Sequence, residues 1–339
     1  MNNNKVISKE TAEELKALLS HPKKILLTTH KSPDGDAIGS SLALYHYLKA
    51  QGHDVYVSVP DDMPDFLKWL PGSDKFIIFY RRKKKFEEIL NNADIVFALD
   101  YNHFKRTGDE MAKLLSQSES LKIMIDHHQQ PDDFMQYRVW DVMASSTAQL
   151  VWEFIVALSG KQAVDKTIGE CLYTGIMTDT GSFRFATCTS HTFRITADLL
   201  DIGVRGDLIH QYVYDQNSID RIHLMGYALE KIVLMPEQKT AYIALSKEEL
   251  KKFKYKPGDT EGLVNKVLSV VGVEVAALIT EKENQVRLSL RSSGNFSVNQ
   301  LSRTYFSGGG HENAAGGSLE MSFDDAIKYF KDSIKKAIQ

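Results

Sequence analysis

Five short segments hold the side chains of this sequence that are best suited to chemistry. They contain His30, Asp34 and Asp36; Asp100; Asp126, His127 and His128; Asp179; and the run Gly308, Gly309, Gly310 and His311. Carboxylates and imidazoles without thiolates are ligands for hard or borderline divalent cations. A glycine triplet predicts a turn whose amide N–H groups cradle a phosphate without side-chain obstruction. Together these features predict a metal-dependent phosphoesterase.

Bulk composition indicates an ordinary globular protein. A chain of 339 residues exceeds the size at which one core stops growing, so two domains are expected. The formal net charge of −3 argues against a protein that coats long nucleic acid or a long duplex, yet it allows a short phosphorylated ligand. The basic run 81–85 is interpreted as a solvated loop and helix start, with a substrate-steering patch as the alternative.

The expected location is the cytoplasm. The longest apolar stretches are too short to span a bilayer, and the first residues lack the pattern of a signal peptide. Only two cysteines, Cys171 and Cys188, are present, so neither a disulfide framework nor a cysteine-rich zinc site is expected.

Alternating strands and helices in the first 200 residues predict an α/β fold with a doubly wound, mostly parallel sheet. The predicted strands are 24–29, 55–59, 94–99 and 121–125, and the predicted helices are 38–50, 147–158, 165–177 and 189–203. Ser145, Ser146 and Thr147 are expected to cap the second of these helices. His30, Asp100 and Asp126 each follow or end a strand. Ligands of such sheets bind beyond the carboxyl ends of the strands, so we expect these residues to form one site.

The sequence predicts three regions: a catalytic metal-binding domain over 1–205, a helical connector over 206–238, and a smaller α+β substrate-binding domain over 239–339. Predicted strands of the last region are 241–245, 273–280 and 285–290, with helices at 262–271 and 323–338. Arg287 and Arg291 alternate along the third of these strands, so they should share a face and bind substrate phosphates.

Taken singly, the acidic residues have simpler explanations. Asp34 or Asp36 alone would be explained as a turn residue, with Gly35 allowing a tight turn. Asp126 alone could cap a helix. In combination they predict two manganese ions, about 3.5–4 Å apart, that clamp a phosphoryl oxygen and generate a hydroxide for in-line attack.

The five segments also resemble a known family. HKSPDGDAIGS, LDYN, IDHH, TDTGSFRF and GGGHENAAGG, in this order, are similar to the motifs of the DHH phosphoesterase superfamily, in the subgroup with a DHH-associated C-terminal domain. The resemblance implies an active-site cleft between two domains. It also implies hydrolysis of short RNA or DNA oligonucleotides to nucleoside monophosphates, of 3′-phosphoadenosine 5′-phosphate (pAp) to AMP, or of dinucleotides.

The resemblance further implies a role for each residue. His30, Asp34 and Asp100 would hold one Mn²⁺, while Asp36, Asp100, His127 and Asp179 would hold the other, with Asp100 bridging. Mg²⁺ or Co²⁺ could substitute. Asp126 would orient His127, and His128 would face the scissile phosphate. Arg287, Arg291, Gly308, Gly309, Gly310 and His311 would bind substrate.

Several alternatives stay open. A phosphodiesterase for linear or cyclic dinucleotides would use the same chemistry. A family II pyrophosphatase lacks the glycine–histidine signature, and an exonuclease of long strands needs additional modules. A metal-binding nucleotide sensor without catalysis belongs to a different class of protein. The sequence leaves a homodimer open.

Overall fold

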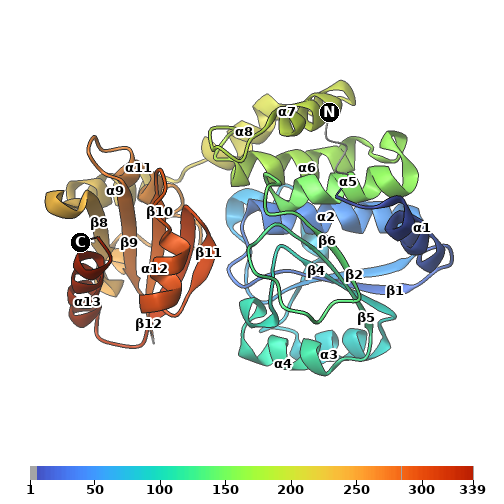
Figure 1. Ribbon diagram of the computed structural model, residues 1–339, viewed down its shortest axis with the longest axis horizontal. Helices are drawn as coiled ribbons and strands as arrows, with labels where there is room; N and C mark the ends of the chain where they lie inside the picture. The colour runs from blue at the N-terminus through green and yellow to red at the C-terminus, as the bar shows by residue number, and fades with distance from the viewer. Residues whose placement is uncertain (1–5, 284, 339) are drawn as a thin grey trace. The chain divides into compact units, whose positions relative to one another are not determined.

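The computed structural model describes residues 6–283 and 285–338, and it divides the chain into two compact units (Figure 1). The first unit ends at Gln216 and the second begins at Asn217. The predicted connector 206–238 spans this division. Its helix α8 (Gly206–Tyr214) packs against helix α6 (Lys166–Asp179) of the first unit. Its helix α9 (Ile219–Glu230) packs against strand β8 (Thr240–Leu245) and helix α11 (Leu263–Leu268) of the second.

A parallel sheet forms the centre of the first unit, and its strand order is β3-β2-β1-β4-β5-β6. The central strands are apolar on both faces, as parallel strands are when helices cover both sides. All four predicted strands are present. The bounds of the strands are β1 Lys24–Thr28, β2 Asp54–Val59, β3 Ile77–Ile78, β4 Ile95–Leu99, β5 Leu121–Asp126 and β6 Tyr137–Trp140.

Helices lie on both faces of this sheet, which confirms the predicted doubly wound fold. Figure 1 shows α2 (Gly35–Ala50), α5 (Thr147–Ser159) and α6 (Lys166–Asp179) above the sheet, and α3 (Lys83–Asn92) and α4 (Asp109–Gln117) below it. The remaining helices of the unit besides α8 are α1 Lys9–Leu18 and α7 Ser190–Asp201. Apolar side chains from both sets of helices fill the two layers between helices and sheet.

Helices α2 and α6 approach each other unusually closely through glycine. A Cβ atom at Gly39 would lie 2.5 Å from the carbonyl oxygen of Cys171 and 2.9 Å from the amide of Gly175. The prediction that Gly35 forms part of a tight turn is wrong, because Gly35 is the first residue of α2. A Cβ added at Gly35 would collide with the side chain of Thr178. The glycines therefore let the two helices meet at backbone contact distance, and this brings the N-terminus of α2 beside the C-terminus of α6.

The second unit is a smaller α+β fold, as predicted, around a mixed sheet of order β11-β12-β10-β9-β8-β7. Only β8 and β9 pair in parallel within the described residues; the other neighbours are antiparallel. The strands are β7 Val233–Met235, β8 Thr240–Leu245, β9 Val275–Glu281, β10 Val286–Ser292, β11 Gly309–His311 and β12 Ala314–Leu319. The helices besides α9 are α10 Lys247–Lys252, α11 Leu263–Leu268, α12 Val298–Tyr305 and α13 Phe323–Ala337.

The glycine triplet does not form the predicted turn. Gly309 and Gly310 belong to edge strand β11, which pairs with β12. Gly308 donates its amide to the carbonyl of Ser302 (3.3 Å), and a Cβ there would collide with the carbonyl of Gly316. The small residues thus serve close packing between the end of α12 and the β12 backbone.

The basic run 81–85 is exposed and largely paired with acids. Arg81 contacts Asp62, and Lys83 contacts Glu110 over 2.7 Å. Helix α3 begins at Lys83, so the interpretation as a solvated loop and helix start is confirmed. Among the described residues, no helix combines the length and the apolar character needed to cross a membrane. Cys171 and Cys188 are free thiols.

Candidate metal centre

The candidate site lies where the strand order of the first sheet reverses. The chain runs outward from β1 through β2 to β3, then returns to place β4 on the other side of β1. Doubly wound sheets bind ligands at this switch point, beyond the carboxyl ends of the strands. His30 follows β1 and Asp100 follows β4, so two predicted ligands from distant parts of the sequence become neighbours.

Asp100 lies at the centre of the cluster. It is 2% exposed and has a left-handed backbone (φ +63°), which places it among the uncommon conformations that proteins keep at functional sites. Its Oδ2 lies 3.2 Å from His30 Nε2, whereas its Oδ1 lies 3.6 Å from His127 Nε2. The two oxygens of one carboxylate therefore face two different groups of ligands.

The first group contains His30, Asp34 and Asp100, whose ligand atoms lie within 4.8 Å of one another. Asp34 has two functions in this structure. Its Oδ1 accepts the amides of Asp36 and Ala37 as the N-cap of α2, and its Oδ2 lies 3.9 Å from His30 Nε2. Capping by one oxygen orients the other oxygen toward the histidine.

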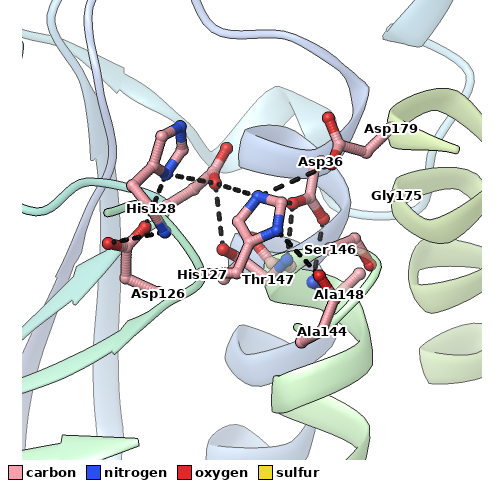
Figure 2. Close-up of polar contacts among 12 residues, drawn as sticks. Asp36, Asp126, His127, His128, Ala144, Ser146, Thr147, Ala148, Gly175 and Asp179 are labelled. Atoms are coloured by element: carbon pink, nitrogen blue, oxygen red, sulfur yellow. Dashed lines mark hydrogen bonds and ion pairs between the residues drawn. The ribbon is translucent and has the colours of Figure 1, made fainter. Parts of the chain in front are cut away.

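The second group contains Asp36, Asp100 and His127, with ligand atoms again within 4.8 Å. His127 Nε2 lies 3.8 Å from Asp36 Oδ2 and 3.5 Å from Asp179 Oδ2 (Figure 2). Asp179 is the last residue of α6, so the close contact between α2 and α6 delivers it to Asp36 and His127. The structure thus brings together all six residues predicted as metal ligands.

Thr147, the first residue of α5, holds two of these carboxylates and was not predicted as part of the site. Its amide donates to Asp36 Oδ2 (2.6 Å) and its hydroxyl to Asp100 Oδ1 (2.9 Å). The amide of Ala148 donates to Asp36 Oδ1 (2.8 Å). Ser146 caps the helix, as predicted, by accepting the amide of Gln149. Free amides and the positive end of the helix dipole make this N-terminus a favourable place for a carboxylate.

Asp126 orients His128 rather than His127, which corrects the expected role. Asp126 Oδ1 lies 2.7 Å from His128 Nδ1, and Asp126 Oδ2 accepts the amide of His128 (3.2 Å). His127 Nδ1 instead faces the carbonyl of Ala144 over 3.2 Å (Figure 2). A carbonyl acceptor fixes a proton on Nδ1 of His127, so Nε2 carries the lone pair that a cation would take.

The carboxylates of the cluster lie close enough to repel one another electrostatically. Burial raises the pKa of Asp36 well above its ordinary value, and the charges of Asp100, Asp179 and Asp34 raise it further. Burial alone would also raise the pKa of Asp100, but the bond from His30 and the nearby imidazoles bring it below the ordinary value. A positive charge among these oxygens would relieve the repulsion.

For the imidazoles of the cluster, burial lowers the pKa and the nearby carboxylates raise it. Burial alone lowers the pKa of His30, but its bond to Asp100 brings the pKa above the ordinary value. For His127, the charges of Asp179 and Asp100 likewise outweigh burial. Buried oxygen and nitrogen donors without sulfur, in two groups that share Asp100, are the donor set that divalent cations such as Mn²⁺ prefer. The residues present therefore fit divalent cations.

Three predicted substrate residues of the second unit, Arg287, Arg291 and His311, lie on one face of its sheet. On β10, Arg287 is exposed and Arg291 half-buried, and both point away from the buried Leu288 and Leu290. Arg291 pairs with Ala314, which in turn pairs with His311, and residues directly opposite in antiparallel strands share a face. Small side chains on β12 thus separate the two arginines from His311 on a polar surface.

Comparison with known proteins identifies the family. Residues 24–176 match the N-terminal domain of the DHH family, and residues 238–338 match the DHHA1 domain. The bifunctional oligoribonuclease and PAP phosphatase NrnA of Thermus thermophilus is 31% identical, over 96% of this chain and 93% of the relative. The chain belongs to the DHH family.

Two further relatives match most of this chain at lower identity. The NrnA protein of Bacillus subtilis is 27% identical over 91% of this chain and 93% of its own length. The cyclic-di-AMP phosphodiesterase GdpP of Bacillus subtilis is 24% identical, and the match covers 97% of this chain but 50% of that protein. These relatives are hydrolases, and the prediction that the chain is a hydrolase of this family is confirmed.

Solved structures support the fold. An exopolyphosphatase-related protein from Bacteroides fragilis is 39% identical, with a TM-score of 0.91 and coverage of 98% of both chains. RecJ from Thermus thermophilus, solved in complex with Mn²⁺, is 14% identical with a TM-score of 0.57, over 99% of this chain and 55% of RecJ. The second comparison concerns the fold alone.

Proposed function

We propose that this protein is a phosphoesterase, dependent on divalent cations, that hydrolyses short oligonucleotides to nucleoside monophosphates, pAp to AMP, or both. The observation that carries this proposal is the position of Asp100, whose Oδ2 faces His30 and whose Oδ1 faces His127. A carboxylate shared between two groups of ligands is the arrangement needed for a pair of cations.

In this proposal His30, Asp34 and Asp100 hold one cation, and Asp36, Asp100, His127 and Asp179 hold the other. When bound, the cations supply Lewis acidity, which neutralises charge on the phosphoryl oxygens and acidifies a water molecule. Mn²⁺ is the preferred ion because the donors mix imidazole with carboxylate.

His128 is the residue of the cluster best placed to act on the reacting phosphate. It is buried, and its Nδ1 is held by Asp126 over 2.7 Å, so Nε2 is the nitrogen directed elsewhere. The pKa of His128 is well below the ordinary value because burial and neighbouring positive charge disfavour the imidazolium. A neutral imidazole with a fixed Nδ1 proton can share the other nitrogen with a phosphate hydroxyl or a water, and Asp126 stabilises the proton on Nδ1.

The second unit supplies substrate contacts in this proposal. Arg287 and Arg291 present guanidinium groups on one face of β10, and His311 adds a ring nitrogen on the same face. Guanidinium groups bind phosphate oxygens in a bidentate manner. The small residues of β12 between them leave space for a flat ligand such as a nucleobase.

A second candidate is a phosphodiesterase for linear or cyclic dinucleotides. The cyclic-di-AMP phosphodiesterase GdpP aligns with 97% of this chain, so both units of this protein have counterparts in it. The same cluster would hydrolyse either substrate, because the scissile group is a phosphodiester in both.

A panel of substrates tests the proposal. Purified protein with Mn²⁺ is incubated with a trinucleotide RNA, a 24-nucleotide RNA, pAp and cyclic-di-AMP, and products are resolved by chromatography. The matched control is Asp100→Asn, which keeps the shape but removes the shared charge. We expect Mn²⁺-dependent release of nucleoside monophosphate from the trinucleotide or pAp, and no detectable product with Asp100→Asn.

The outcomes separate the candidates. Faster cleavage of cyclic-di-AMP than of the trinucleotide and pAp would favour the second candidate. Binding of nucleotides and Mn²⁺ without product from any substrate would indicate a sensor and overturn the proposed hydrolysis. Equal rates for the long and short RNA would contradict the preference for short substrates.

A further inference from the structure

Arg106 lies beside the candidate metal centre, and the sequence pattern had given it no function. It belongs to the short helix η3 (Phe104–Thr107), which follows Asp100 along the chain. Its carbonyl accepts the amide of Lys31 (2.7 Å), and Lys31 directly follows His30. Arg106 is therefore attached to the chain just beyond both β1 and β4, at the switch point that carries the cluster.

The segment around Arg106 is held firmly in place. Thr107 is buried, and its hydroxyl donates to the carbonyl of Phe104 (2.8 Å). Asn102 donates its side-chain amide to the carbonyl of Gln129 (2.7 Å), which ties the segment to the chain that follows His128. The backbone of Arg106 thus has a fixed position relative to the site.

The guanidinium group of Arg106 is not bound by the part of the chain that the structure describes. Among residues 6–283 and 285–338, its side chain makes no hydrogen bond and no ion pair, although it is half-buried. By contrast, Arg81, Arg138 and Arg205 each pair with an aspartate at the surface. The N–H donors of Arg106 therefore lack an acceptor within these residues, and an anion from outside the chain is the partner that would satisfy them.

The positive charge of Arg106 acts on His128 and Asp126. Burial lowers the pKa of His128, and the positive charge of Arg106 lowers it further. Burial raises the pKa of Asp126, while the charges of His127 and Arg106 oppose this rise. Both effects are those of a positive charge that acts on the Asp126–His128 pair.

We propose that Arg106 binds a phosphate oxygen of the substrate at the edge of the candidate metal centre, on the side where His30 and His128 lie. A guanidinium group presents paired N–H donors that match phosphate geometry, and it keeps its charge at every physiological pH. The inference rests on the proposed function in that it assumes a phosphate-bearing ligand. It makes Arg106 a contact supplied by the first unit, in addition to those proposed for the second.

The test measures binding of a phosphate group separately from catalysis. Titration calorimetry with AMP is carried out on Mn²⁺-loaded wild-type protein and on Arg106→Ala, Arg106→Lys and Lys105→Ala. Lys105 is an exposed cation next to Arg106, so its removal changes the net charge equally without removing the proposed contact. A parallel titration with Mn²⁺ alone reports whether the cluster itself is intact.

We expect Arg106→Ala to weaken AMP binding about tenfold or more, because a hydrogen bond between charged groups contributes at least that factor to affinity. Arg106→Lys should recover part of the loss, and Lys105→Ala should change AMP affinity less than about twofold. Mn²⁺ affinity should stay within about threefold in all variants.

Equal AMP affinity in Arg106→Ala and Lys105→Ala would overturn the inference, as would wild-type protein that does not bind AMP. A loss of Mn²⁺ affinity that accounts for the whole loss of AMP affinity would show that Arg106 supports the cluster and would also overturn it. If AMP binding depends on Arg106 while no panel substrate is hydrolysed, the inference stands and the proposed hydrolysis fails.

Discussion

The hydroxyl of Thr147 donates a hydrogen bond to Asp100 Oδ1 over 2.9 Å, and both residues are buried. The two residues are 47 positions apart in the sequence and belong to different layers of the first unit. The amide of Thr147 simultaneously binds Asp36. One residue at the start of α5 therefore fixes the orientation of two proposed metal ligands.

Replacing Thr147 by valine should weaken metal binding while the fold persists. Valine has the shape of threonine but lacks the hydroxyl, so Asp100 loses a donor while the amide contact to Asp36 remains. Loss of such outer contacts typically costs about 10–100-fold in metal affinity or activity. Calorimetric titration with Mn²⁺ and the rate of trinucleotide hydrolysis measure the effect, and Thr147→Ser should restore most of it.

Thr174→Val is the matched control for Thr147→Val. Thr174 is also buried, but its hydroxyl donates to the carbonyl of Glu170 within its own helix. Its removal should leave Mn²⁺ affinity unchanged. If both valine variants lost metal affinity equally, the effect would come from packing and not from the contact with Asp100.

Asp126→Asn should separate catalysis from metal binding. The asparagine keeps the shape but loses the charge that holds His128, whereas His127 retains its contact with Ala144. We expect kcat to fall about 10–100-fold, as for other residues that orient a functional imidazole, with Mn²⁺ affinity nearly unchanged. A fall in Mn²⁺ affinity as large as that of His127→Ala would mean that Asp126 acts on His127 after all.

Gly39→Ala should destabilise the first unit. The new Cβ would lie 2.5 Å from the carbonyl oxygen of Cys171, and backbone cannot move away as a flexible side chain can. Overpacking of this kind costs about 1–3 kcal/mol. Trp69, Trp140 and Trp152 all belong to the first unit, so the urea midpoint followed by tryptophan fluorescence reports this unit alone.

Gly226→Ala should have the opposite effect on stability to Gly39→Ala. Gly226 lies in α9, its backbone φ is not positive, and nothing lies within 4 Å of an added Cβ. Alanine should stabilise the second unit by about 0.4–1 kcal/mol through its higher helix propensity and the lower entropy of the unfolded chain. Circular dichroism measures this change. Stabilisation by both substitutions would refute the argument from close helix packing.

Glu249→Gln should reduce the stability of the second unit in a manner that depends on pH. Burial acts to raise the pKa of Glu249, but bonds from Lys231, Tyr227 and the amide of Ser246 outweigh it and bring the pKa to about 2. Since the folded-state pKa is below the unfolded one, the contribution is present above about pH 4.5 and is lost as the pH falls toward 2.

The unfolding midpoint of wild type and Glu249→Gln, measured by circular dichroism at pH 7 and pH 3, tests this sign. The partly exposed pair should contribute at most about 1 kcal/mol at pH 7, and the difference should be smaller at pH 3, where part of the contribution has been lost. A difference that grows with acidity would contradict the assigned pKa direction.

By itself, the sequence determined the architecture and the identity of the proposed ligands. Apolar runs of strand length between helical patterns are local signals, and His30, Asp100 and Asp126 could be placed because parallel strands all present their carboxyl ends at one edge. The arginines of β10 were likewise placed on one face by the two-residue period of a strand.

Only the tertiary structure decided which partner each side chain takes. Asp126 directly precedes His127 and lies two positions before His128 in the sequence, and the conformation of the chain after β5 directs it to His128. Thr147 reaches Asp100 only through the packing of α5 against the sheet, and Gly39 is required only because α6 lies against it. Such contacts depend on how distant segments pack, and no short-range pattern of residues specifies that packing.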